Sequence, residues 1–286
     1  MDDHLRKALL KLSQNSRVTA SQFTPTQRAA LDQFSRQTGA VYCQKQGRGD
    51  LYYISDQCLF DTHLMALSPQ IQHPLAEDLP SRALHIAHAR NSKAGTHQHE
   101  FFYLTLKAVG NNVCWTNNFH NKLLPLSQLT QDFGVASLSI ASDDAWYSEQ
   151  PLWLVENQAL FDQTNWFMPD TNASIVYYGG QLNGRLLHWL STRPRATKIM
   201  FFPDYDGVGL TNFARLYAIL GEQCECWLMP DWEKKLIQYG NHTVWKNTHQ
   251  FLNDNQVLLP EYLTPLILKM RQTGLALEQE AVWLPI

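Results

Sequence analysis

From about residue 150 onward, short apolar runs alternate with amphipathic stretches. The apolar runs that predict strands are 152–155, 174–178, 198–202 and 224–229. Apolar residues at helical spacing predict helices over 157–167, 181–191 and 210–220. Strands that are apolar throughout and that alternate with helices indicate a parallel sheet covered on both faces. The pattern therefore predicts an α/β domain in this half of the chain.

The first third of the chain predicts two helices followed by a hairpin. Leucines at helical spacing predict a helix over 4–14, and a second helix starts at Pro25 behind the capping residue Thr24 and ends before Gly39. Runs of strand-forming residues at 40–44 and 51–55 flank a turn-prone basic segment. This order is typical of a winged helix, and a small helical cap with a hairpin remains an alternative.

The middle of the chain is less regular. Residues 68–82 hold three prolines and few large apolar residues, which predicts a linker. Strands are expected at 101–109 and 113–116, joined by a turn, whereas 119–142 has no clean period. The predicted division is a winged-helix-like domain at 1–67, a linker at 68–82, an α+β region at 83–148 that contacts DNA, and an α/β domain with a C-terminal extension at 149–286.

Composition and charge narrow the functional classes. Hydrophobic residues are 44% of the 286 residues, enough for a core. The net charge of −3 argues against a simple electrostatic nucleic-acid binder. However, residues 1–122 carry 13 Lys and Arg against 9 Asp and Glu, and residues 123–286 carry 10 against 17. The total is a cancellation between a mildly basic part and an acidic part, so local DNA binding stays open.

The cellular context follows from what the sequence lacks. No run approaches 18 apolar residues, so no transmembrane helix and no membrane partner are predicted, and the acidic N-terminal tip does not suit a secretory signal. The five cysteines include no CxxC pair, and Cys224 and Cys226 are expected to pack within a strand. A cytoplasmic protein is expected.

Three carboxylates directly follow predicted strands: Glu156 follows the first, and Asp204 and Asp206 follow the third. Ligands of open parallel sheets bind beyond these strand ends. Asp204 and Asp206 are two residues apart and are expected to face one side, while Tyr205 points away. Converging carboxylates without nearby cations repel each other unless a cation is bound. Oxygen ligands of this kind suit Mg²⁺ or Mn²⁺.

The Asp-X-Asp-Gly sequence also occurs in structures that are not magnesium sites. The same residues form ordinary turns and helix starts. A calcium loop of the EF-hand kind is excluded, because Val208 and Arg215 stand where oxygen ligands are required. A phosphatase of the haloacid-dehalogenase kind stays open as an alternative. Such an enzyme needs a later pair of acids to bind magnesium, and here only the isolated Asp231 and Asp254 follow.

The sequence around these acids resembles the Toprim domain of topoisomerases, primases and related nucleases. The matching features are Glu156-Asn157 after the first strand, Gly179-Gly180 before the second helix, Asp204 and Asp206, and the near-terminal Leu277-Glu278-Gln279-Glu280. The resemblance is closest to the group that contains topoisomerase VI and, nearer still, JetD, the nuclease subunit of Wadjet plasmid-defence systems. It covers residues 150–283 specifically, and a winged helix ahead of Toprim fits that group.

The resemblance implies a Toprim fold, a Rossmann-like parallel sheet, and a metal-dependent DNA endonuclease. Asp204 and Asp206 would coordinate Mg²⁺ or Mn²⁺, Glu156 would bind a metal or handle a proton, and Glu278 and Glu280 are further candidate ligands. The implied partners are double-stranded DNA, an SMC-like ATPase complex that presents it, and a second copy of the chain in a homodimer. A non-catalytic DNA-binding or assembly subunit with the same fold is one alternative.

A tyrosine transesterase is the second alternative, with candidate nucleophiles Tyr42, Tyr52, Tyr53 and Tyr103, although strand packing is the simpler role for the first three. The cations predicted to contact DNA are Lys45, Arg48, Arg90, Lys93, Arg185, Arg193 and Arg195. Each has a solvated surface as its alternative role. The cluster of His85, His88, His97 and His99 lies in a segment for which phosphate contact is favoured over a transition-metal site.

Overall fold

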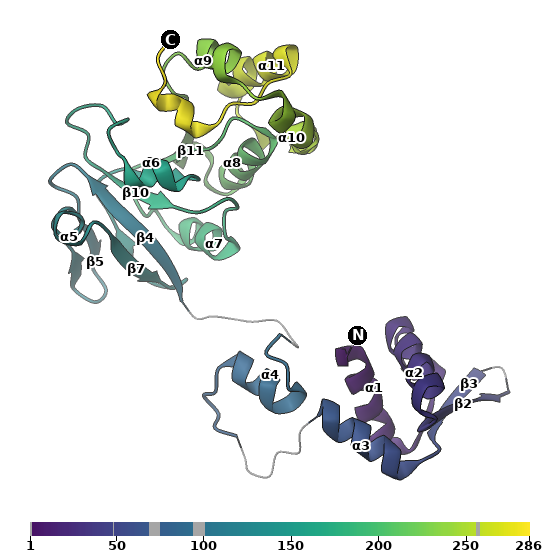
Figure 1. The fold of residues 1–286 in the computed structure, drawn as a ribbon. Helices are drawn as coiled ribbons and strands as arrows, with labels where there is room; N and C mark the ends of the chain where they lie inside the picture. Colours follow the sequence, from purple (N-terminus) through teal and green to yellow (C-terminus); the bar gives the residue numbers. More distant parts are fainter. Residues whose placement is uncertain (1, 48, 69–74, 94–100, 256–257) are drawn as a thin grey trace. The chain divides into compact units, whose positions relative to one another are not determined.

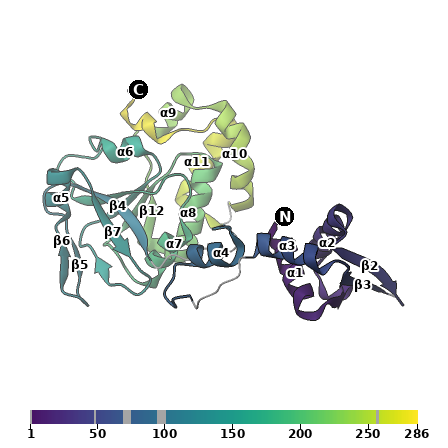
Figure 2. The same cartoon turned by 60° about the horizontal axis from the view of Figure 1, so that its bottom comes forward.

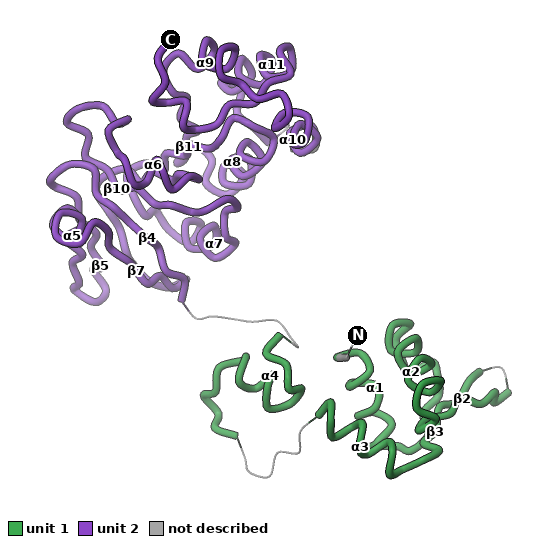
Figure 3. The backbone as a smooth tube through the Cα atoms, in the orientation of Figure 1, with its two compact units in different colours: residues 1–99 green, residues 100–286 purple. Residues whose placement is uncertain are grey.

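The computed structural model describes residues 2–47, 49–68, 75–93, 101–255 and 258–286, and Figures 1 and 2 show it from two sides. The chain forms two compact units, residues 1–99 and residues 100–286, which Figure 3 draws in different colours. Each unit has its own hydrophobic core. No helix among the described residues is long and apolar enough to cross a membrane.

The first unit is a small helical module with one antiparallel sheet. Its elements are α1 (Asp2–Asn15), β1 (Arg17–Thr19), η1 (Ala20–Gln22), α2 (Pro25–Thr38), β2 (Val41–Gln46), β3 (Gly49–Ile54), α3 (Gln57–Leu67) and α4 (Ser81–Ala89). The strands lie in the order β1-β3-β2. Thr24 caps α2 by accepting a hydrogen bond from the backbone N–H of Gln27, and Gly39 ends the helix at φ 69°. The predicted order of helix, helix and hairpin is confirmed.

The second unit is a mixed α/β fold around a six-stranded sheet. Its strands are β4 (Phe102–Val109), β7 (Ala136–Ile140), β9 (Leu152–Val155), β10 (Ala173–Tyr177), β11 (Ile199–Phe202) and β12 (Cys224–Cys226). They lie in the order β12-β11-β9-β10-β4-β7. The four strands from β12 to β10 are mutually parallel, and β4 pairs antiparallel with both of its neighbours. The predicted parallel βα region is confirmed, and the sheet extends beyond it.

The helices of the second unit alternate with these strands and then gather after β12. They are α5 (Leu126–Phe133), α6 (Gln158–Asp162), α7 (Gly184–Thr192), α8 (Gly207–Leu220), η2 (Gly221–Gln223), α9 (Trp232–Tyr239), α10 (His242–Asn255), η4 (Glu261–Leu263), α11 (Thr264–Thr273) and η5 (Gln279–Trp283). Helix α10 packs beside α8 (Figure 2). The predicted helix at 157–167 is much shorter in the structure, since α6 ends at Asp162.

The structure corrects two predictions for the middle of the chain. Strands form near 101–109 and 113–116, but they are not a hairpin: β4 lies in the large sheet, whereas β5 (Trp115–Asn117) pairs with β6 (Lys122–Leu124) and β8 (Trp146–Tyr147). The division at 148/149 is therefore wrong, because β4 and β7 complete the same sheet as β9–β12 and the compact unit begins at residue 100. Within the predicted linker, residues 69–74 lie outside the described part, and α4 already begins at Ser81.

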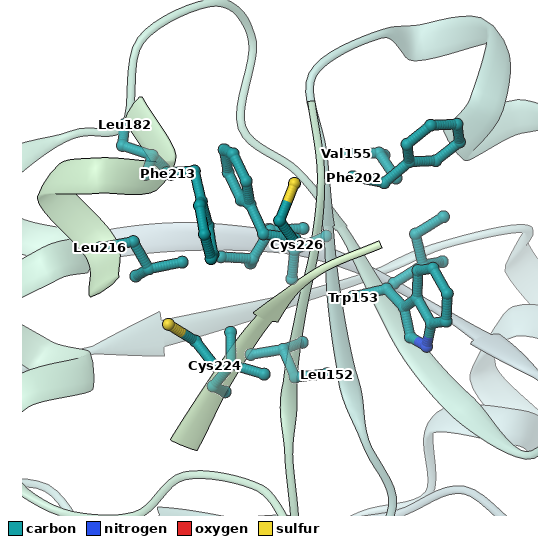
Figure 4. Packing of buried hydrophobic residues seen from close by; sticks show 14 of the residues in the cluster. Leu152, Trp153, Val155, Leu182, Phe202, Phe213, Leu216, Cys224 and Cys226 are labelled. Atoms are coloured by element: carbon teal, nitrogen blue, oxygen red, sulfur yellow. The ribbon is translucent and has the colours of Figure 1, made fainter. Parts of the chain in front are cut away.

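Hydrophobic side chains on both faces of the large sheet are buried, as Figure 4 shows. On one face, Leu182, Phe213 and Leu216 cover the sheet, and Cys224 and Cys226 pack there as buried free thiols, as predicted. On the other face, Trp153 makes edge contacts with the rings of Phe167 and Trp227. This packing fixes the strands, and hence the ends from which the carboxylates project.

The C-terminal extension is fastened across the carboxyl edge of the sheet. Leu277 and Tyr205 exchange backbone hydrogen bonds of 2.7 and 3.0 Å. The buried Lys235 donates from Nζ to the carbonyl oxygens of Ala281 and Val282, each at 2.9 Å. These bonds hold η5 beside the ends of β9 and β11, near α6 (Figure 1). The extension thereby forms a wall of the carboxylate site.

Candidate functional site

The strand order brings the predicted acids to one edge of the sheet. Strands β9 and β11 are direct parallel neighbours, with Val155 opposite Phe202. Glu156 follows the first of these residues, and Asp204 comes two residues after the second. The parallel pairing of β9 with β11 therefore brings Glu156 close to the Asp-X-Asp pair.

Glu156 is a half-buried carboxylate with one side-chain partner. Tyr178 donates from its hydroxyl to Oε2 of Glu156 at 3.1 Å. Burial raises the pKa of Glu156 to about 7, and the negative charges of Asp206 and Glu280 act in the same direction. The hydrogen bonds from Tyr178 and from the backbone of Asp204 oppose this rise. The group can therefore take up or release a proton near neutral pH.

Asp204 lies in the same acidic surroundings. Burial raises its pKa to about 8, and the charges of Glu156, Asp206 and Glu280 add to the rise. The backbone N–H of Gln279 donates to Oδ1 of Asp204 at 2.8 Å and opposes it. No strand continues to this residue, since β11 ends at Phe202.

Asp206 combines a structural role with its place in the acidic group. It caps α8, and its Oδ1 accepts a hydrogen bond from the backbone N–H of Gly209 at 2.7 Å. The residue is only 8% exposed, and burial raises the pKa of its carboxyl despite this bond. An ordinary helix start is thus present, together with a carboxylate near other acids.

Two glycines after Asp206 are required by close backbone packing. A Cβ on Gly207 would come 1.8 Å from the carbonyl oxygen of Thr248 in α10. A Cβ on Gly209 would come 2.2 Å from the carbonyl oxygen of Asp204. No side chain fits in either space. The Asp-Tyr-Asp-Gly-Val-Gly sequence is therefore shaped by the approach of α8 and α10 as well as by its acids.

Tyr205 anchors the loop that carries the two aspartates. Its side chain is fully buried; the hydroxyl donates to the carbonyl oxygen of Trp227 at 3.2 Å and accepts from the backbone N–H of Met229 at 2.6 Å. The prediction that Tyr205 points away from the acids is consistent with this burial. The loop is held by the segment that follows β12 on one side and by Leu277 on the other.

Gln279 is the main residue of the site that the sequence did not predict. Its side chain is fully buried and joins two strand ends: Oε1 accepts from the backbone N–H of Asn157, and Nε2 donates to the carbonyl oxygen of Phe202. With its own N–H on Asp204, Gln279 ties the ends of β9 and β11 to the C-terminal extension. The near-terminal Leu-Glu-Gln-Glu sequence did indicate that this segment belongs to the site. It drew attention to the two charged glutamates, however, and not to the glutamine between them.

Those glutamates lie next to the acidic group. Glu278 has an extended backbone and precedes η5, whereas Glu280 lies within η5. Glu278 is exposed, and its charge acts on Asp206. Glu280 acts on both Glu156 and Asp204, and its Oε2 is buried without a hydrogen-bond partner among the described residues.

These five carboxylates, Glu156, Asp204, Asp206, Glu278 and Glu280, form what we call the acidic edge. None of them belongs to the ion pairs formed by the described residues. Nor does any group of three or more His, Cys, Asp and Glu side chains in the described part of the chain have an arrangement that could hold a metal ion. The donor set nevertheless fits Mg²⁺ or Mn²⁺, which one or two carboxylates hold together with water and phosphate oxygens.

The prediction that Arg195 contacts DNA is wrong. Its side chain is 1% exposed and pairs with Asp144, whose Oδ1 lies 3.0 Å from Nη1. Further donors of the guanidinium reach Thr192 and the carbonyl oxygen of Trp189, and the group lies over the Trp189 ring. A buried guanidinium engaged on all sides cannot reach a phosphate. The charged residues close to Arg195 in the sequence are basic, so the sequence could not indicate that the distant Asp144 pairs with this side chain.

The remaining predicted DNA-contacting cations differ in exposure. Lys45, Arg90 and Lys93 are exposed, and Arg48 lies outside the described residues. Arg185 is half-buried and donates to the carbonyl oxygen of Phe101 at 3.3 Å. Arg193 is also half-buried, lies over the ring of Phe119, and reaches the carbonyl oxygen of Asp143 at 3.5 Å. His97 and His99 fall outside the described residues as well.

The candidate tyrosine nucleophiles are also distinguished by their surroundings. Tyr52 is a core residue of the first unit, and its hydroxyl donates to Asp32 at 2.6 Å, in agreement with a packing role. Tyr42 and Tyr103 are exposed. Tyr42 and Tyr53 face each other across β2 and β3 with ring centroids 5.9 Å apart.

Comparison with known proteins addresses the second unit. Residues 103–283 match the family described as "Domain of unknown function (DUF7281)". The match runs through β4, β7 and the βα region as one stretch, in agreement with the single compact unit. No curated protein matches the chain. Because the family match spans more than half of the 286 residues, the chain belongs to the DUF7281 family.

Proposed function

We propose that this protein is a metal-dependent DNA endonuclease of the Toprim type, with its hydrolytic site at the acidic edge. One observation carries the proposal: Glu156, Asp204 and Asp206 come from the ends of neighbouring strands to one place, and Glu280 adds a buried oxygen without a hydrogen-bond partner among the described residues. The Toprim resemblance of the same residues supports it.

The acidic edge supports a role for Mg²⁺ or Mn²⁺ through its charge. Converging carboxylates that have no cationic partner are costly unless protons or a metal ion reduce their repulsion. Asp204 and Asp206 would hold the ion, with Glu156 as a ligand or as the group that moves a proton. When bound, the ion would neutralise phosphodiester oxygens and help to activate a water nucleophile.

The first unit supports contact with double-stranded DNA. Its helix, helix and hairpin order is that of a winged helix, and Lys45 lies exposed on the hairpin strand β2. Exposed Arg90 and Lys93 follow α4. Such cations position a protein on the phosphate backbone without reading sequence. The resemblance further supports an SMC-like ATPase complex as the partner that presents the DNA, and a homodimer as the form that cuts both strands.

Cleavage of closed circular plasmid in Mg²⁺ or Mn²⁺ tests the proposal. The protein is assayed alone and with the proposed SMC-like ATPase complex. We expect Glu156→Gln and Asp204→Asn to lower the rate by about 100-fold or more, since metal-ion stabilisation of a phosphoryl transition state amounts to several kcal/mol. Glu149→Gln, which changes an exposed glutamate of the same unit outside the acidic edge, is the matched control and should leave the rate unchanged.

The outcomes separate the three functional classes. Cleavage that survives both substitutions contradicts the acidic edge as the site. A DNA end covalently linked to protein favours the tyrosine transesterase, with the exposed Tyr42 and Tyr103 as the first residues to replace. DNA binding without cleavage under every condition favours the non-catalytic binding or assembly subunit.

A further inference from the structure

Strand β7 is the last strand at one edge of the large sheet (Figure 1). It pairs antiparallel with β4 on its inner side, and no strand of the described residues pairs with its outer side. The side chains of Ser137 and Ser139 are exposed, so solvent reaches this strand. An edge strand of this kind presents backbone N–H and C=O groups with which another strand can pair.

The hydrogen bonds of the neighbouring strands show which way the backbone groups of β4 point. In β10, the N–H of Ser174 donates to the carbonyl oxygen of Pro151, on the side of β9. Ala108 of β4 lies opposite Ser174, and its own N–H donates to the hydroxyl of Thr130 in α5. Ser174 and Ala108 are therefore a pair without mutual hydrogen bonds, and Ala108 directs its backbone groups away from β10.

The same alternation assigns the backbone groups of β7. Leu104 lies four residues before Ala108, so it also points away from β10 and bonds to Leu138, which lies opposite it in β7. Because Leu138 faces β4, its neighbours Ser137 and Ser139 each direct one N–H and one C=O to the outer side. These groups have no hydrogen-bond partner among the described residues.

The opposite edge of the same sheet is protected in ways that β7 is not. Strand β12 is only three residues long and carries the exposed Glu225 at its centre, and the N–H of Cys226 donates to the Tyr262 hydroxyl at 2.8 Å. Short length, charge and coverage are the usual means of blocking an edge. Strand β7 has five residues, and the surrounding segment 133–142 contains neither a charged residue nor a proline.

The outer side of β7 is complementary to itself about a two-fold axis at Leu138. In an antiparallel pair around this axis, Ser137 of one copy lies opposite Ser139 of the other, and their outward backbone groups meet. Val135, which is 38% exposed, then lies opposite Ala141, and apolar surface is removed from water. No like charges come together, because the segment is uncharged.

We propose that β7 joins two copies of this chain by antiparallel edge pairing, which makes one continuous sheet from both. The occupant is a second copy, because the one register that satisfies the outward groups of Ser137 and Ser139 is symmetric. The closed pair leaves neither copy with an open β7. The pairing places the contact of a homodimer at this strand, and it does not depend on the proposed nuclease activity.

Sedimentation equilibrium of the 286-residue chain measures the dimer. We expect a mass of twice 32.9 kDa, which falls on dilution. Ser139→Pro removes an outward N–H that β7 does not use toward β4, so the dissociation constant should rise about 10-fold or more. The melting temperature at a concentration where the wild type is monomeric shows whether this variant still folds.

A second variant avoids the backbone change of a proline. Ser137→Glu with Ser139→Glu places like charges opposite each other across the axis and should give a monomer where the wild type is a dimer. Mixing this variant with Ser137→Lys, Ser139→Lys should restore a dimer, since the opposed charges are then of opposite sign. Gln250→Glu with Gln272→Glu, at exposed positions of α10 and α11, is the control and should leave the dissociation constant unchanged.

Disulfide cross-linking tests the register. Directly opposed residues of a bonded antiparallel pair have Cα atoms about 5.5 Å apart, which suits a disulfide. An equal mixture of Ser137→Cys and Ser139→Cys should therefore cross-link, whereas either variant alone should cross-link far less, because its two cysteines are more than about 7 Å apart. The wild type, with its exposed Cys58 and Cys114, gives the background.

Four results would overturn the proposal. These are a monomeric wild type at about 100 µM, where even a dimer of micromolar affinity forms, a dimer that both the proline and the glutamate variants leave unchanged, cross-linking by one cysteine variant alone as efficient as by the mixture, and pairing of β7 with an unrelated extended peptide in a chain that stays monomeric. None of these measurements uses cleavage. A dimer that does not cut plasmid contradicts only the nuclease, and a monomer that cuts it contradicts only the pairing.

Discussion

Two buried clusters of charged residues in the second unit differ in whether their charges are paired. Around Arg195, one cation meets one carboxylate, and the remaining donors and acceptors are satisfied by Thr192, by Trp189 and by backbone groups. At the acidic edge, several carboxylates act on one another, no ion pair of the described residues includes them, and one oxygen of Glu280 is unpaired within that part of the chain. Both clusters lie at loops beside the same sheet.

The difference separates a cluster whose charges are balanced within the protein from one whose carboxylates have no cationic partner among the described residues. The Arg195 cluster is complete within the protein, and burial lowers the pKa of the arginine only to about 10, so its charge stays at all ordinary pH values. The acidic edge is incomplete until protons or a cation arrive, as the raised pKa values of Glu156 and Asp204 indicate. The sequence analysis identified Arg195 and the five carboxylates, but it did not identify Asp144 as the partner of Arg195.

The largest expected effect comes from breaking the balanced cluster. Arg195→Met removes the cation and leaves Asp144 unpaired with only 12% of its side chain exposed, so we expect a loss of about 3–5 kcal/mol in the free energy of unfolding. Urea denaturation measures it. Lys246→Met, at an exposed position, should stay within about 0.5 kcal/mol of wild type. A loss for Arg195→Met no greater than for this control would show that the cluster does not anchor the fold.

A smaller effect is expected from the glycines that shape the acidic edge. Gly209→Ala places a methyl group against the carbonyl oxygen of Asp204 and should cost about 1–3 kcal/mol through overpacking. Gly184→Ala, at the start of α7, meets nothing within 4 Å and should change stability by less than about 1 kcal/mol, in the stabilising direction. Thermal unfolding of the two variants tests the opposite signs. Equal destabilisation would contradict the close packing of α8.

A third effect is the pH dependence of the stability that the acidic edge confers without divalent metal. The pKa values of Glu156 and Asp204 are raised by burial to about 7 and about 8 in the folded protein, above the ordinary values of the unfolded chain. The folded state therefore holds protons that the unfolded state has released. This contribution to stability is complete below about pH 4 and is lost as the pH rises to about 8. The melting temperature should fall between about pH 6 and about pH 8.5.

The double variant Glu156→Gln, Asp204→Asn isolates this contribution. Its melting temperature should fall less than that of wild type over the same range, because the two amides do not titrate. Asp206, Glu280 and Tyr178 act on the pair, and Glu278 acts on Asp206. These residues and the histidines remain in both proteins, so the comparison of the two slopes isolates the pair. An unchanged slope would show that the acidic edge does not retain protons near neutral pH.

Much of the second unit could be predicted because its signals are local. The apolar runs that became β9–β12 are short and uninterrupted, and Thr24 with Gly39 marks the ends of α2 in the first unit. The carboxylates were found because parallel strands place their ends at one edge, a rule that needs only the strand order. The sequence did not predict that β9 and β11 are neighbours, and the structure shows that they are.

The failures all involve partners that are distant in the sequence. Strand β4 pairs with β10 across more than 60 residues, so a hairpin with its immediate neighbour was the natural but wrong expectation. Arg195 resembles any surface arginine until Asp144, 51 positions earlier, packs against it. Gln279 gains its role only where three chain segments meet. Periodicity and capping carry no information about such long-range pairing.

The bond between Gln279 and Asp204 joins residues 75 positions apart, and this separation has a consequence for biosynthesis. The last strand of the large sheet ends at Cys226, so the ribosome delivers the complete sheet well before residues 276–283. Before that segment docks, Asp204 lacks its hydrogen bond from Gln279, and neither aspartate has the neighbouring glutamate whose charge acts on it. The sheet that carries the acids is therefore synthesised before the segment that completes their surroundings.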